Sequence, residues 1–174
     1  MVNLFQGKTT TIYNYIILIL ICISQSCVAQ NNKTDSLIKN FKKEISFSQK
    51  HFGRIIWESD MKLSYYSLMS ICPANTLINL TSDTDPVIRS YSFVGLARRK
   101  TNLSVLQKII QEHENDTSSY SESSTDVVHM WKVIDFMKMT LKLATDRKLP
   151  ALNYKKEIEK IRDELQIAIK GNHH

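Results

Sequence analysis

The chain has 174 residues, a length that suits one domain with a core of ordinary size. It contains only 4 glycines and 3 prolines, a composition that favours helices and argues against a β-sandwich or β-barrel. The formal net charge is +6, but the basic residues are scattered and no aromatic residues are interleaved with them, so they indicate solvated helix faces and not a nucleic-acid surface.

The N-terminal segment, residues 1–29, has the layout of a secretory signal peptide. Lys8 precedes an unbroken apolar run over residues 16–23, which is shorter than the roughly 20 residues that a membrane span needs. Small residues then occupy the positions that a signal peptidase reads, and cleavage is predicted before Gln30. An uncleaved anchor or a buried helix is the alternative.

Cys27 offers a third possibility, lipidation, in which this cysteine becomes the first residue of a membrane-tethered lipoprotein. The usual signal has an apolar residue three positions before the cysteine, whereas Ser24 stands there. If cleavage follows Ala29, Cys72 is the one cysteine left, and it can form no internal disulfide. Its position at a helix start could stabilise a thiolate, but a buried core thiol is the simpler interpretation.

Residues 30–34 are predicted to form a polar linker, and residues 35–170 a single helical domain. An amphipathic helix is expected to run from the linker to Gly53, where the glycine suits a helix end. The short apolar stretch over residues 54–57 is compatible with either a helix or an extended segment.

A second helix is expected to begin at Ser59 or Asp60, either of which can act as its N-cap, and to end near Ile71. The middle of the chain then predicts two helices joined by a tight turn. Pro73 suits the first turn of one helix, and the short polar residues 82–84 suit the turn.

The second of these two helices carries a recognisable pattern. Aspartate and proline are followed by a free position, an apolar residue, arginine, small residues three and six positions further on, and leucine. The residues that carry it are Asp85, Pro86, Ile88, Arg89, Ser92, Gly95 and Leu96. The pattern resembles a HEAT repeat, which implies a short α-solenoid of helix pairs in a right-handed superhelix. Such a pair cannot bury its apolar face alone and must stack on neighbouring pairs.

Physical chemistry and the resemblance assign roles to these residues. Asp85 is expected to cap the helix, with Pro86 at its first position. The resemblance implies that Asp85 and Arg89 take part in a polar ladder between adjacent repeats, with Asp116 as a possible partner. The small residues Ser92 and Gly95 would allow close helix approach. A capped helix in another kind of bundle is the alternative.

Three further segments complete the expected domain. Thr101 or Asn102 can cap a helix that fades near residue 113. The serine-rich residues 116–125 are predicted to be a loop, and residues 127–145 the most buried helix.

The last predicted helix, residues 151–170, would cap the solenoid. The alternative is that this helix pairs with a helix of a partner chain. Residues 171–174 are predicted to be a disordered tail.

The predicted function is that of an exported scaffold, periplasmic or secreted, that binds another protein or a peptide without catalysis. No phosphate loop, dinucleotide fingerprint or zinc signature occurs in the sequence, so no cofactor, metal or catalytic residue is predicted. Any membrane association would come through the lipid tether or an uncleaved anchor, and the oligomeric state is open.

The resemblance also allows an enzyme, because some HEAT-like proteins are bilin lyases and others are DNA glycosylases. Such an enzyme would need an acidic residue near aromatic residues in a groove. The candidates are Glu58 near Trp57, and Asp135 near Trp131 and Phe136.

Overall fold

The computed structural model describes residues 32–124, 127–150 and 152–171. It divides into a unit of residues 1–36 and a unit of residues 37–174, and the second unit is described below. The predicted signal peptide, its cleavage site, Cys27 and residues 172–174 of the predicted tail lie outside the described residues.

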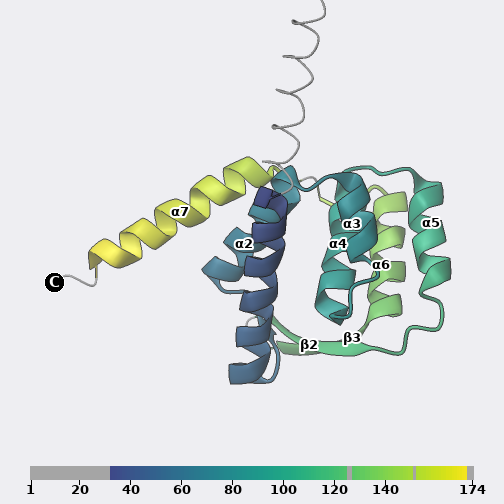
Figure 1. Ribbon diagram of the computed structural model, residues 1–174, viewed down its shortest axis with the longest axis horizontal. Coiled ribbons are helices and arrows are strands. Elements are labelled where there is room, and N and C mark those ends of the chain that lie inside the picture. Colours follow the sequence, from purple (N-terminus) through teal and green to yellow (C-terminus); the bar gives the residue numbers. More distant parts are fainter. Residues whose placement is uncertain (1–31, 125–126, 151, 172–174) are drawn as a thin grey trace, which may run out of the picture. The chain divides into compact units, whose positions relative to one another are not determined.

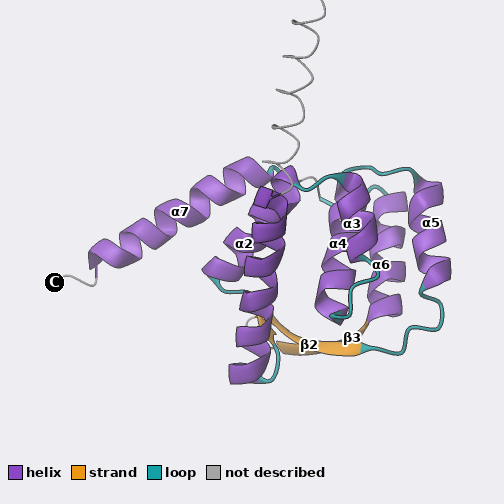
Figure 2. Cartoon of the chain, in the orientation of Figure 1, coloured by secondary structure: helices purple, strands orange, loops and turns teal. Residues whose placement is uncertain are grey.

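The protein is mainly helical, as predicted (Figure 2). A helix covers residues 32–52, so residues 32–34, expected to belong to a linker, are helical. The remaining helices are α2 (Ser59–Ile71), α3 (Ala74–Leu80), α4 (Pro86–Arg98), α5 (Leu103–Glu112), α6 (Val133–Thr145) and α7 (Tyr154–Gly171). Within the described residues, no helix is both long and apolar enough to cross a membrane.

A small sheet accompanies the helices and corrects two predictions. Its strands are β1 (Ile55–Ile56), β2 (Ser119–Ser124) and β3 (Val127–Lys132), in the order β1-β2-β3. β1 pairs with β2 in parallel, and β2 pairs with β3 antiparallel. The expected loop over residues 116–125 is therefore largely a strand, and the helix expected from residue 127 begins at Val133.

The physical reason for this hairpin is non-local. Tyr120 lies opposite Trp131 in the β2–β3 register, and Tyr120 is buried against Phe136 with their ring centroids 6.1 Å apart. An extended backbone places every second side chain on one face, so β2 can bury Tyr120 while Ser119 and Ser121 lie on the other face. The many serines of this segment are typical of a loop, and local composition does not reveal that Tyr120 packs against Phe136.

The helices α3, α5 and α6 pack around α4. Figure 1 shows α3, α4, α6 and α5 side by side, with the β2–β3 hairpin across one end. α4 packs against α3 and α6, while α5 packs mainly against α6 and α7 packs against α2. Almost all of the 13 residues of α4 are buried. α4, and not the helix predicted over residues 127–145, is therefore the most enclosed helix of the bundle.

The start of α4 matches the sequence prediction. The Asp85 side chain accepts hydrogen bonds from the backbone N–H groups of Val87, at 2.8 Å, and Ile88, at 3.4 Å. Pro86 occupies the first helical position. Asp85 therefore satisfies two N–H groups that have no partner within the helix, as an N-cap residue does.

Gly95 leaves room on α4 for the side chain of Met69 from α2. A Cβ atom added at Gly95 would lie 2.2 Å from Sδ of Met69 and 3.4 Å from Cδ1 of Leu77. Met69 is only 1% exposed, so its side chain has little space into which to move. The small residue that the HEAT-like pattern requires here is thus explained by packing.

We predict that Gly95→Ala destabilises the protein, although alanine favours a helix by about 1 kcal/mol over glycine. The clash with Met69 outweighs that gain, because overpacking a core costs about 1–3 kcal/mol. Chemical denaturation should show a net loss of roughly 1 kcal/mol. In a Met69→Ala background the same substitution should be neutral or stabilising, and a loss of equal size in both backgrounds would contradict the packing explanation.

Candidate functional site

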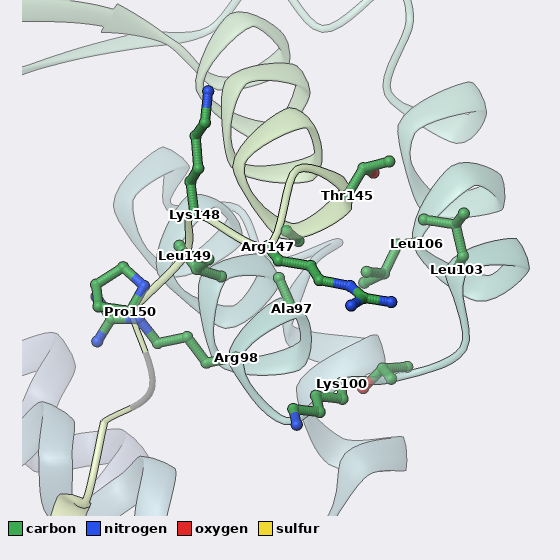
Figure 3. A pocket seen from close by; sticks show the side chains of 12 residues that line it. Ala97, Arg98, Lys100, Leu103, Leu106, Thr145, Arg147, Lys148, Leu149 and Pro150 are labelled. Carbon is green, nitrogen blue, oxygen red and sulfur yellow. The ribbon is translucent and has the colours of Figure 1, made fainter.

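The candidate site is a pocket where the C-terminal ends of α4 and α6 meet the N-terminal end of α5 (Figure 3). Its volume is about 820 Å³, within the range of pockets that hold small ligands or peptide side chains. β3 runs directly into the first turn of α6, and the pocket lies at the last turn of that helix. The sheet and the pocket therefore lie at opposite ends of α6.

The lining of the pocket combines an apolar surface with positive charge. Apolar side chains come from α4, α5, α6 and the connector after α6. They are Ala97, Leu103, Leu106, Ala144, Leu149 and Pro150. The charged lining residues are Arg98, Lys100, Arg147 and Lys148. No aspartate or glutamate is among the twelve lining residues. Such a lining repels a metal cation and favours an anionic ligand with an apolar part.

Most of this positive charge lacks a carboxylate partner within the described residues. Lys148 lies 3.8 Å from the carboxylate of Asp146, with both side chains well exposed. Within the described part of the chain, neither Arg98, Lys100 nor Arg147 forms an ion pair with a carboxylate. Figure 3 shows the Arg147 side chain reaching across the pocket toward Leu106, whereas Lys148 points away from it. The positive charge without a carboxylate partner is therefore concentrated on Arg98, Lys100 and Arg147.

Two of the pocket cations also have unusual backbone conformations. Lys100 has φ of 56° and Arg147 has φ of 57°, and in the described chain no other non-glycine residue has positive φ. This left-handed conformation usually falls to glycine or asparagine after a helix, because a Cβ atom makes it unfavourable. Both positions therefore keep a long cationic side chain where glycine would be the more stable choice. Strain of this kind often marks functional sites.

The polar residues of the HEAT-like pattern, Asp85 and Arg89, lie at the other end of α4. Nη1 of Arg89 donates to the carbonyl oxygens of Asp83, at 2.6 Å, and Thr84, at 3.0 Å. Nε of Arg89 lies 3.0 Å from Oδ2 of Asp116, which is the ion pair that the sequence analysis named. Arg89 therefore ties the turn between α3 and α4 to the segment that follows α5.

Two further contacts extend this polar cluster. Nζ of Lys42 lies 2.5 Å from Oδ2 of Asp83, which joins the helix over residues 32–52 to the turn. Nε2 of His113, at the end of α5, is within hydrogen-bonding distance of the carbonyl oxygen of Thr81. The cluster joins segments far apart in sequence and does not contribute to the pocket, so its role is structural.

The acidic residues proposed for an enzyme are not the ones that meet the aromatic residues. Glu58 and Asp135 are both exposed. Glu122 on β2, which the sequence analysis missed, accepts hydrogen bonds from Nε1 of Trp57, at 3.0 Å, and from the hydroxyl of Tyr91, at 2.8 Å. Glu122 lies two residues after buried Tyr120. In a strand the two side chains share one face, and this spacing was the available sequence signal.

The surroundings of Glu122 suit a structural role. Burial, reinforced by the Glu122 carboxylate, raises the pKa of Tyr91 well above its usual value, so this phenol stays protonated and remains a donor. Both hydrogen bonds to Glu122 come from side chains of the aromatic cluster, in which the rings of Trp57 and Tyr91 are 4.6 Å apart. Glu122 therefore links β2 to α4 through Tyr91 and to the segment before α2 through Trp57.

No family model, curated protein or solved structure matches the chain.

Cys72 is predicted to be unreactive in the folded protein. Its side chain is 1% exposed, and burial raises its pKa to about 11 although Arg99 opposes the effect. The nucleophilic thiolate is therefore scarce at pH 8. In a full chain with Cys22→Ser and Cys27→Ser, a thiol reagent such as DTNB should label Cys72 only after denaturation. Rapid labelling of the native protein would contradict this.

The polar cluster at the start of α4 should make stability depend on pH in the acid range. Burial raises the pKa of Asp83, but hydrogen bonds from Lys42 and Asp85 outweigh it, and the net pKa is lowered. The pKa of Asp116 is also lowered, because hydrogen bonds from Ser118 and the charge of Arg89 outweigh burial. A carboxyl whose pKa is depressed by folding adds stability above its unfolded pKa, about 3.9, and loses it as pH falls through the folded value.

We therefore predict that the unfolding free energy declines as pH falls below about 5, and that Asp116→Asn makes this decline shallower. Urea denaturation at several pH values between neutrality and strong acid measures the slope. Asp135→Asn, at an exposed carboxyl on α6, is the matched control and should leave the slope as it is. Equal slopes for wild type and Asp116→Asn would contradict the assignment.

Proposed function

We propose that this chain is an exported, non-catalytic helical scaffold whose basic pocket binds an acidic, partly apolar segment of another protein or a peptide. The observation that carries the proposal is the group of uncompensated cations around an apolar surface at the ends of α4, α5 and α6. Binding would use charge and shape complementarity and would require no chemistry from the protein.

The arrangement of the helices supports a short α-solenoid as the framework. We propose that α3 with α4, and α5 with α6, are successive HEAT-like pairs, and that the helix over residues 32–52 with α2 precedes them. The packing of α4 against α6 supports the stacking of the second helices of two pairs. Arg89 and Asp116 supply a polar link between successive pairs, at 3.0 Å. In this view the β2–β3 hairpin is an insertion within the last pair.

The chemistry of the pocket defines the ligand class. Guanidinium and ammonium groups form charge-assisted hydrogen bonds with carboxylates, which are stronger than bonds between neutral groups. Leu103 is 43% exposed at the pocket, so it offers apolar surface that a ligand side chain can cover. A segment in which glutamate or aspartate alternates with leucine or similar residues satisfies both requirements.

The proposed location follows from the sequence of residues 1–29. We propose that the signal peptide delivers the domain to the periplasm or the exterior, with Cys27 lipidation as a route to a membrane-tethered form. An exported scaffold would meet its partner among envelope or secreted proteins.

We predict that Lys100→Gln combined with Arg147→Gln weakens binding of an acidic apolar peptide. A fluorescein-labelled peptide of repeating Glu-Leu dipeptides serves as the probe, and fluorescence anisotropy measures its affinity for the full chain. Losing two charged donors should lower affinity at least about tenfold, because a hydrogen bond to a charged group contributes about 1.5–3 kcal/mol.

The matched control is Lys62→Gln combined with Lys155→Gln, which removes the same charge at exposed positions outside the pocket. This control should leave affinity within about twofold of wild type, since distant surface charges are screened. A repeating Lys-Leu peptide should not bind. An equal loss of affinity in both double variants would show a general charge effect and would overturn the pocket assignment.

A further inference from the structure

The outer edge of β3 presents unpaired backbone groups. Within the described residues β3 hydrogen-bonds to β2 along one side, and no strand follows it in the sheet. The N–H of Val133, the residue after β3, donates to the carbonyl oxygen of Ser118 at 3.0 Å. Hydrogen-bonded pairs occur at every second position of an antiparallel ladder, so Trp131, His129 and Val127 direct their backbone groups toward β2. Val128, Met130 and Lys132 therefore direct theirs to the free edge.

This edge is unusually apolar for one in contact with water. The exposed fractions are 53% for Val127, 52% for Val128 and 76% for Met130. Natural proteins usually protect a free edge with charges, proline or a bulge. β3 contains no proline, and its one lysine stands at its end. An edge of this kind is suited to pairing with another strand.

We propose that the free edge of β3 pairs antiparallel with β3 of a second copy of this chain, with His129 on the two-fold axis. In this register Val128 of one copy lies opposite Met130 of the other, a pair that occurs twice by symmetry, while Lys132 lies beyond the paired residues 127–131. Val127 lies opposite Trp131 on the other face of the sheet. The two three-stranded sheets become one continuous sheet.

The sequence of β3 favours this register and this occupant. One alternative register that uses the same edge groups places Met130 opposite Met130 and Lys132 opposite Val128. The proposed register instead pairs Val128 with Met130 at both positions, so no lysine lies opposite a valine. Cross-strand apolar pairs stabilise a sheet by about 0.2–1 kcal/mol each. The two-fold axis closes the assembly as a dimer, so no further copies add to this edge.

The proposal is independent of the pocket. β3 lies at the first turn of α6 and the pocket at its last turn, so pairing through β3 leaves both pockets open. A dimer would present two binding sites, and a partner with two acidic segments would then bind with higher avidity.

Site-specific cross-linking tests both the dimer and its register. The full chain with Cys22→Ser and Cys27→Ser is given a cysteine at one β3 position and oxidised mildly. Residues directly opposite in an antiparallel pair have Cα atoms about 4.5–5.5 Å apart, which suits a disulfide. His129→Cys should therefore form a covalent dimer on non-reducing gels.

Val127→Cys is the matched control on the same strand and the same face of the sheet. In the proposed register the two copies of residue 127 are offset by four residues, about 14 Å, which is too far for a disulfide. Preferential cross-linking of His129→Cys would support the proposal. Absence of a covalent dimer, or equal cross-linking at both positions, would overturn it.

A second variant tests the interaction without a cysteine. Met130→Lys introduces a charge into both apolar edge-facing pairs and should weaken dimerisation roughly tenfold, because the substitution acts twice in a symmetric dimer. Met139→Lys places the same charge at an exposed methionine on α6, which is 38% exposed, and serves as the control. Sedimentation equilibrium measures both, with circular dichroism to confirm folding. A wild-type chain that is monomeric at about 100 μM, or equal effects of the two variants, would contradict the proposal.

Discussion

The burial of α4 is the constraint on which the rest of the structure depends. A helix enclosed by other elements must hydrogen-bond its polar groups internally, because an unsatisfied buried polar group costs about 1–3 kcal/mol. Arg89 is only 8% exposed, and its guanidinium reaches the carbonyl oxygens of Asp83 and Thr84 and the carboxylate of Asp116. Close packing at Gly95 completes the enclosure. The neighbouring helices are thereby fixed in position, and so are their ends, which form the pocket.

The two ends of the bundle differ in chemistry as a result. At the start of α4, acidic and basic groups pair with one another, Arg89 with Asp116 and Lys42 with Asp83. At the end of α4, cations surround an apolar surface without carboxylate partners among the lining residues. The contrast directs the search for a ligand to the second end.

The sequence predicted what depends on local chemistry. The Asp85 cap and Pro86 at the first helical position follow from rules that act within one turn, and the structure confirms them. The hairpin could not be predicted in this way, because residues 127–132 contain apolar residues compatible with either a helix or a strand. Pairing with residues 119–124 and burial of Tyr120 decide between the two.

The pocket could also not be predicted from the sequence. Its lining comes from three helix ends, and a scattered distribution of basic residues along the chain concealed their convergence in space. Lys100 and Arg147 gave no sign of their left-handed conformation, because the residue expected after a helix in that conformation is glycine. The prediction that basic residues form solvated helix faces remains adequate for residues such as Lys62, but it does not explain the cations of the pocket.

Chemical footprinting of lysines tests the central claim, that the pocket binds acidic segments, most directly. The full chain would be acetylated with and without a saturating amount of the repeating Glu-Leu peptide, and mass spectrometry would give the modification rate at each lysine. If the pocket binds the peptide, acetylation of Lys100 should slow several-fold while that of Lys62 stays unchanged. An unchanged rate at Lys100 with bound peptide, or equal protection of both lysines, would contradict this claim.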